Sequence, residues 1–444
     1  MLRRTFIKKS TLSALSVSFL GAINLNGKRA DTKSLRVTGQ RIESRIKELA
    51  KFGRDDNGHG YRVAFTQGDI EGRTWFIELM KKAGLEVNID AGGNIIGKRK
   101  GTNQSLRPIG FGSHIDMVPD GGNYDGTLGS LSALEVIEVL NENKIVTDHP
   151  LEVIIFANEE GGTIGSKALA GLLTTEGLTK LSQSGLTMAE GIKAIGGNPD
   201  NIQSVIRKSG HLHAWLELHI EQGGLLENEN LQIGVVEGIV GMMDWDVTIE
   251  GFANHAGSTP MNMREDALLA ASKFVIAVNE VIKSVPGKQV GTVGKIAALP
   301  GASNVIPGKV TVSLEVRDLS IEKVEMLFGE IQKRADKIAA DSKTKISFQP
   351  QFTIKPALSN KSLQEKINAS AKNLGLTTKF MQSGAIHDSQ NMSLIAPMAM
   401  IFVPSVGGIS HSPKEFTKTD DMTNGANVLL QTILNVDKEL RFDK

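Results

Sequence analysis

The chain of 444 residues contains no cysteine. Disulfide bonds and thiolate metal ligands are therefore excluded, and a metal ion would have to be held by histidine, aspartate or glutamate. Proline is also scarce, with 13 residues against 47 glycines. This balance is typical of a turn-rich α/β protein and not of a disordered chain.

The sequence also lacks an excess of either charge. It has 50 basic and 49 acidic residues, which leaves a net charge of +1. Such a chain has no basic field that would attract nucleic acid or anionic lipid, so neither partner is expected. Its length is too great for one ordinary hydrophobic core and predicts two domains.

Long hydrophobic runs are missing as well. Residues 10–23 form a moderately apolar stretch that is too short and too rich in serine for a stable membrane span. Arg3 and Arg4 precede it, followed by Phe6 and further basic residues, a pattern typical of a twin-arginine export signal. We therefore expect residues 1–33 to direct a folded protein to the periplasm. The alternatives are a retained signal anchor, since no clean Ala-x-Ala site follows, and a basic tail on a cytoplasmic protein.

Histidines and carboxylates recur along the chain where apolar runs end. The runs that predict buried strands are 108–112, 151–157, 214–218 and 398–403. The polar residues that follow or end them are His114, Asp116, Asp125, Glu159, Glu160, His219 and His411. Ligands of open α/β sheets bind at the carboxyl ends of the strands, so these side chains are expected to meet in one crevice. Imidazole and carboxylate donors suit zinc, manganese, cobalt or nickel, which makes hydrolysis by a metal-activated water the first chemistry to consider.

Hydrophobic periodicity predicts the order of the secondary structure. Helices are expected near 37–53, 69–84 and 129–141, with a hairpin over 85–99. Residues 171–211 are polar and predict short helices and loops. The alternation of strands and helices predicts an α/β domain with a mixed, largely parallel sheet flanked by helices.

The pattern changes at about residue 237. Alternating strands are expected at 245–249, 310–316 and 345–352, with helices at 264–283 and 320–340 between them. This order predicts an inserted α+β domain of ferredoxin-like type. The chain then returns to the first domain, with a helix, a strand and a closing helix at 361–374, 398–403 and 420–439. The expected division is 1–33 (signal), 34–236 (catalytic domain, first part), 237–353 (inserted lid) and 354–444 (catalytic domain, second part).

Together these motifs resemble the M20 metallopeptidase superfamily, and within it the dinuclear amidohydrolase branch. That branch includes N-carbamoyl-L-amino acid hydrolases, β-ureidopropionases and allantoate amidohydrolases. The matching blocks are GSHIDMVPDGGNYDGTLG, FANEEGG, ELHIEQGGLLE, GFANHAGSTPM, SNVIPG, EVRD, SGAIHDSQ and VGGISHSPKEF. They occur in order from about residue 40 to the C-terminus, so the resemblance covers nearly the whole chain.

The resemblance implies roles for the metal-binding residues. Asp125 would bridge two divalent ions, with His114 and His219 on one ion and Glu160 and His411 on the other. Asp116 would accept the second ring N–H of His114 and fix its tautomer. Glu159, next to a ligand but not one itself, would act as the general base.

The resemblance also implies the substrate contacts. Arg317 would clamp the substrate carboxylate through a bidentate pair. Asn304 and His255 would contact the substrate from the lid, with His255 also stabilising the developing oxyanion. Gln222 would contact the ureido group, and His387 lies on the substrate side of the site.

These roles imply hydrolysis of the C–N bond of an N-carbamoyl-L-amino acid or a related ureido acid. Allantoate is the alternative substrate, followed by a dipeptide or an acylated amino acid. A non-catalytic binding module is disfavoured, because neither Glu159 nor a ligand is missing. The family also implies a homodimer formed through the lid, with His255 reaching the active site of the partner.

Replacing Arg3 and Arg4 by lysine is expected to keep the folded protein in the cytoplasm, since the arginine pair is the part of the signal that the export machinery recognises. Cell fractionation measures the distribution. Arginine at positions 8 and 9 is the control, because it keeps both the charge and the Arg3–Arg4 pair. An unchanged distribution of the lysine variant would favour the basic-tail alternative.

Overall fold

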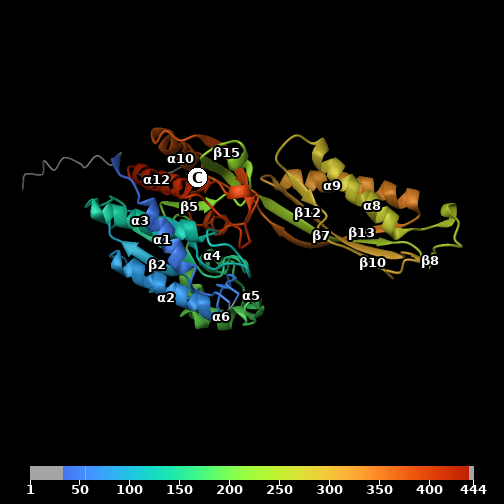
Figure 1. Cartoon of the computed structure of the whole chain (residues 1–444), viewed down its shortest axis with the longest axis horizontal. Helices are drawn as coiled ribbons and strands as arrows, with labels where there is room; N and C mark the ends of the chain where they lie inside the picture. The colour runs from blue at the N-terminus through green and yellow to red at the C-terminus, as the bar shows by residue number, and fades with distance from the viewer. Residues whose placement is uncertain (1–33, 56, 440–444) are drawn as a thin grey trace, which may run out of the picture.

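The structure is a computed structural model that describes residues 34–55 and 57–439. The expected signal, residues 1–33, lies outside the described residues. The described chain is organised by two sheets of unequal size, a broad body on the larger sheet and a narrow arm on the smaller one (Figure 1). Within these ranges, no helix combines the length and the apolarity needed to cross a bilayer.

Four parallel strands form the centre of the larger sheet. They are β4 (Leu151–Phe156), β3 (Ile109–His114), β5 (Ala214–Ile220) and β16 (Met398–Val403), in that spatial order. Every residue of all four is buried. Burial on both faces explains why the strands are almost continuous apolar runs, and it confirms the expected parallel sheet.

The outer strands make this nine-stranded sheet mixed. β1 (Glu86–Ile89) and β2 (Ile95–Arg99) form the expected hairpin, and β2 runs antiparallel to β4. Beyond β16 lie β6 (Ile233–Ile239), β14 (Ala357–Leu358) and β15 (Thr378–Ser383). β15 was not expected from the sequence, because the segment TKFMQS carries only two apolar residues and only two of its six residues are buried.

Helices cover both faces of this sheet. In β4, Val153 and Ile155 belong to one core, whereas Ile154 and Phe156 belong to the core of the opposite face. The first core is closed by α1 (Gly39–Leu49), α2 (Gln67–Lys82), α3 (Thr127–Glu142), α10 (Lys361–Asn373) and α12 (Thr419–Val436). The second is closed by α4 (Ile164–Leu169) and α11 (Asp388–Met392). Residues 171–211 contain short elements, as expected: α5 (Thr175–Thr179), α6 (Met188–Ala194) and a 3-10 helix (Pro199–Val205).

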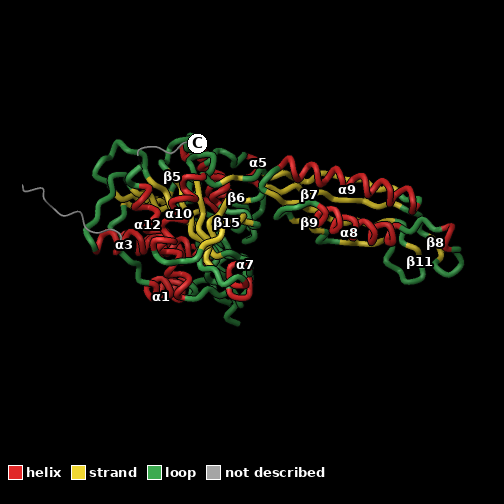
Figure 2. Tube along the Cα trace, turned by 90° about the horizontal axis from the view of Figure 1, so that it is seen from above, coloured by secondary structure: helices red, strands yellow, loops and turns green. Residues whose placement is uncertain are grey.

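The smaller sheet has the ferredoxin-like order that the sequence predicts. Its antiparallel strands are β10 (Ile296–Leu299), β12 (Lys309–Asp318), β7 (Gly241–Glu250) and β13 (Lys345–Ile354), and β9 (Val290–Thr292) also pairs with β12. Two helices, α8 (Ala267–Ser284) and α9 (Ile321–Ser342), cover one face (Figure 2). Residue 237, where the lid was expected to begin, lies in β6 of the larger sheet, so the smaller sheet starts at Gly241.

A small separate sheet forms the far end of the arm. It pairs β8 (Asn254–His255) with β11 (Val305–Ile306). Both figures place these strands at the end of the arm opposite the larger sheet (Figures 1 and 2). The arm therefore carries this tip well away from the edge where the four central strands end.

Candidate metal centre and active-site cavity

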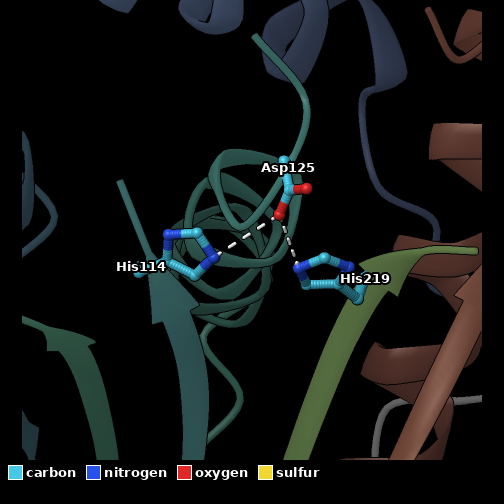
Figure 3. A group of neighbouring side chains, drawn as sticks. All are labelled: His114, Asp125 and His219. Carbon is cyan, nitrogen blue, oxygen red and sulfur yellow. Dashed lines mark ion pairs between the residues drawn. The ribbon is translucent and has the colours of Figure 1, made fainter. Parts of the chain in front are cut away.

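The candidate metal ligands lie at the carboxyl ends of the four central strands. His114 ends β3, His219 is the penultimate residue of β5, and Glu160 lies in the turn after β4. His411 is in the loop after β16. Asp125 lies just before α3 and points between the first two imidazoles (Figure 3). Parallel strands end at the same sheet edge, which explains why residues almost 300 positions apart converge.

Asp125 is the common member of two donor groups. Its Oδ1 lies 3.1 Å from Nε2 of His219 and 3.6 Å from Nε2 of His114. Its Oδ2 lies 3.4 Å from Nε2 of His411, which is also 3.4 Å from Oε2 of Glu160. The donors therefore form the groups His114–Asp125–His219 and Asp125–Glu160–His411, each with its ligand atoms within 4.8 Å of one another. The geometry brings together the same groups that the resemblance implied.

The two buried imidazoles present the correct nitrogen to a metal ion. Nδ1 of His114 lies 3.1 Å from the carbonyl oxygen of Asp116, and Nδ1 of His219 lies 2.9 Å from that of Ile220. A carbonyl can only accept, so both Nδ1 atoms carry the proton and both Nε2 atoms lie next to Asp125, where that of His219 also accepts the backbone N–H of Gly126 at 3.1 Å.

Carboxylate crowding also fits a cation. Burial and the neighbouring Asp125 raise the pKa of Glu160 to about 7. Its Oε1 is buried and, within the described chain, has no hydrogen-bond partner. A divalent cation between these oxygens would relieve the repulsion and satisfy the buried atom. The donor set, two or three imidazoles with carboxylates, is one that zinc, manganese, cobalt or nickel accepts.

Glu159 is buried beside this centre without belonging to either donor group. Its Oε2 lies 3.8 Å from Nε2 of His114. Burial raises its pKa well above the ordinary value, although His114 opposes the change. A carboxylate in this position, next to the centre but outside both donor groups, could exchange a proton with a water molecule bound there, which is the task of a general base.

Asp116 holds the turn that carries the two glutamates. Its carboxylate accepts the backbone N–H groups of Glu159 and Glu160, at 3.3 and 3.1 Å. For the ring of His114, the nearer atom of Asp116 is the backbone carbonyl, while the carboxylate is 3.6 Å away. The expected support of His114 by Asp116 thus comes through the main chain.

Sequence reasoning missed the residues that fix Asp125. Oε1 of Glu415 accepts the backbone N–H groups of Tyr124 and Asp125, at 2.8 and 3.1 Å. Oγ of Ser410 lies 2.9 Å from Asp125 and 2.8 Å from Glu415, so its single hydroxyl proton can be donated to either carboxylate. The signal was present, because both residues lie within the same GISHSPKEF block as His411.

Glu217 was also missed. It is buried in β5, where it accepts the hydroxyl of Ser113 at 2.7 Å and that of Ser389. It also lies close enough to His219 and His387 to form a third potential donor group. An acid within an otherwise apolar strand was the available signal, because a buried carboxylate needs partners.

One cavity of about 870 Å³ joins the metal centre to the base of the arm. The expected site residues that line it are Asp125, Glu159, Glu160, Gln222, Arg317, His387 and His411. Arg317 donates to both carboxylate oxygens of Glu315, at 2.7 and 2.9 Å, and to the carbonyl of Gly384 at 2.7 Å. Gln222 donates to Asp125 at 2.6 Å.

His255 and Asn304 do not line this cavity. They lie next to each other at the far tip of the arm, where Ala256 donates its backbone N–H to the carbonyl of Asn304 at 2.9 Å. His255 is exposed. Within one chain, the structure therefore separates these two expected contacts from the other site residues.

The fold and the donor cluster define a metal-dependent hydrolase of two-sheet architecture. Residues 110–435 match the model of peptidase family M20/M25/M40, and the chain belongs to this family.

Its relatives include enzymes that act on non-peptide C–N bonds. The chain is 38% identical over 402 residues to an N-carbamoyl-L-amino acid amidohydrolase of Geobacillus stearothermophilus, covering 89% of this chain and 98% of the relative. It is 38% identical to a ureidoglycolate hydrolase of Arabidopsis thaliana (93% and 88% covered) and 33% identical to an allantoate amidohydrolase of Escherichia coli (88% and 96%). The solved structure of a hydantoinase/carbamoylase-family amidase from Burkholderia multivorans matches with a TM-score of 0.86 at 36% identity, covering 91% of this chain and 99% of that one.

Gly126→Ala is expected to weaken metal binding by about tenfold to a hundredfold, the usual effect of disturbing the support of a ligand. Gly126 has a φ of 61°, and a Cβ there would lie 2.2 Å from Nε2 of His114. Gly185→Ala is the matched control, because Gly185 has a φ of 85° but open space around its Cβ position. A calorimetric titration with a divalent metal ion measures the metal affinity of both variants. Equal affinities would contradict the role of Gly126.

Proposed function

We propose that the chain hydrolyses the C–N bond of an N-carbamoyl-L-amino acid or a related ureido acid, releasing ammonia, carbon dioxide and the amino acid. The observation that carries this proposal is the shared cavity, which contains the His/carboxylate centre and, on a different sheet, the guanidinium of Arg317. A ureido acid has matching groups, a polar carbonyl for the centre and a carboxylate for Arg317. The named activities of the three relatives support the same class of substrate.

Two divalent ions per chain are proposed at the centre. Asp125 would bridge them, His114 and His219 would bind one, and Glu160 and His411 the other. Such ions polarise a carbonyl group and lower the pKa of water.

Glu159 is proposed as the general base. It would take a proton from the attacking water and later deliver it to the leaving nitrogen. Its buried position beside His114, outside both donor groups, supports this role.

The substrate would be oriented from both ends. Arg317 would hold the carboxylate, and Gln222 would contact the ureido group. Oε1 of Gln222 is buried and accepts no hydrogen bond from any described residue, so it is available to the ureido N–H₂. His387 lies in the same cavity with its ring 4.5 Å from that of His219.

A homodimer is proposed to complete the site. His255 and Asn304 lie on the exposed tip of the arm, far from their own cavity, so a second chain would have to supply these contacts.

Allantoate is the second candidate substrate. It is favoured by the similarity to an allantoate amidohydrolase and by the carboxylate and ureido groups that allantoate carries. Export through residues 1–33 remains part of the proposal.

A substrate panel with ammonia detection on metal-reconstituted protein tests the function. N-carbamoyl-L-amino acids or allantoate are expected to be hydrolysed faster than the corresponding dipeptides, and carboxylate-free ureas much more slowly.

Glu159→Gln is expected to keep its metal content and lose at least about a hundredfold in turnover. Glu176→Gln, at a well-exposed glutamate, is the control. Faster turnover of dipeptides would assign the chain to the peptidase branch instead.

Subunit mixing tests the dimer. Glu159→Gln and His255→Ala chains are each expected to be nearly inactive, because each lacks a catalytic group. If His255 acts in the partner's site, a mixed dimer contains one site with both native groups, and activity returns after subunit exchange. Exchange is verified by tagging one variant and isolating the mixed species. No recovery in that species would place His255 in the site of its own chain.

A further inference from the structure

One cation of the active-site cavity has no hydrogen-bonded or ion-paired partner among the described residues. Lys167 in α4 lines the cavity and is half-buried. Its ammonium makes no hydrogen bond or ion pair with the residues described, namely 34–55 and 57–439. Arg317, the other partly buried cation of this cavity, already donates two hydrogen bonds to Glu315 and one to the carbonyl of Gly384, which leaves one N–H on each Nη for a substrate carboxylate.

The ammonium lies on the wall that carries the general base. A Cβ added to Gly162, just after the two glutamates, would be 4.0 Å from Nζ of Lys167. Thr163 and Asn391 line the cavity on the same wall, and the amide of Asn391 donates to Oγ1 of Thr163 at 3.0 Å. Lys167 therefore lies at a polar part of a cavity that is otherwise rich in apolar side chains.

The position is unfavourable for a lone charge. Burial lowers the pKa of Lys167, while Asp388 and Glu159 oppose the change from a distance. An ammonium that has lost part of its water, and whose nearest carboxylates are not in contact with it, gains when an anion binds directly to it, because the local dielectric is low. The other unpaired lysine lining the cavity, Lys355, is exposed, so water and salt screen its charge.

We propose that Lys167 binds a second acidic group of the substrate, while Arg317 binds the α-carboxylate. This inference rests on the proposed function and narrows it: the preferred substrates are ureido acids with an acidic side chain, such as N-carbamoyl-L-glutamate or N-carbamoyl-L-aspartate. Lys167 is then a determinant of specificity, and the metal centre and Glu159 act in the same way on every substrate.

The test compares N-carbamoyl-L-glutamate with N-carbamoyl-L-glutamine, which have almost the same shape and differ in charge. In the wild type, kcat/KM is expected to be at least about tenfold higher for the glutamate compound. This is the gain that one additional charge-assisted hydrogen bond would give. Lys167→Met is expected to remove this preference by lowering kcat/KM for the glutamate compound, with less than about a twofold change for the glutamine compound. Lys355→Met, the matched control in the same cavity, is expected to keep the preference.

Three outcomes would overturn the inference. Equal kcat/KM for the two compounds in the wild type would leave Lys167 without an acidic partner. An equal loss of kcat/KM for both compounds in Lys167→Met would indicate that the lysine acts as a counter-charge for Glu159 and Asp388 and does not bind the substrate. Loss of the preference in Lys355→Met as well would show that the preference comes from the overall electrostatic potential of the cavity and not from Lys167.

Binding of glutarate, measured by calorimetry, separates this inference from the proposed function. Glutarate carries two carboxylates and no bond to hydrolyse. It is expected to bind the wild type at least about tenfold more tightly than Lys167→Met at equal metal content. If no ureido acid is hydrolysed but this difference is found, the proposed function fails and the anion-binding role of Lys167 stands. If ureido acids are hydrolysed and glutarate binds both proteins equally, the inference fails and the proposed function stands.

Discussion

The rest of the site depends on the placement of one carboxylate, that of Asp125. Its two oxygens face different donor groups, with the imidazoles of His114 and His219 on one side and that of His411 on the other. These groups come from strands and loops that are distant in sequence, and Asp125 is the residue that belongs to both of them. Glu415 holds the backbone N–H groups of Tyr124 and Asp125. The loop after β16 therefore determines the direction of the Asp125 carboxylate, which lies much earlier in the chain.

Much of this arrangement could be predicted from the sequence because the central strands are buried on both faces. Burial makes β3, β4, β5 and β16 continuous apolar runs, and a polar residue at the end of such a run is conspicuous. The half-exposed β15 gives no such signal, so it was missed. Which atom of Asp116 supports His114 could not be predicted either, since that choice depends on the path of the backbone in one turn.

The arm illustrates a different limit of sequence reasoning. Its alternating strands predicted the ferredoxin-like order, because one face of the smaller sheet packs on α8 and α9 and the pattern has a period of two. The motifs with His255 and Asn304, in contrast, indicated a role in the active site but not a location. The structure places them on the exposed tip, outside the cavity of their own chain, and for this reason their proposed role in catalysis involves a second chain.

Backbone conformation explains how neighbouring residues in this site acquire different roles. Asn158, Thr163, Gln222 and His411 all have φ values between 50° and 58°, in the left-handed region that non-glycine residues rarely adopt. Each costs of the order of 1 kcal/mol or more, so the surrounding structure must stabilise it. At Asn158 the turn directs two successive N–H groups to the single carboxylate of Asp116. The side chains of Glu159 and Glu160 then diverge, one toward His114 and the other toward His411. Two adjacent glutamates can thereby face the two positions that the proposed roles of base and ligand need, which an extended strand would not allow, because it would point one of them away from the cavity.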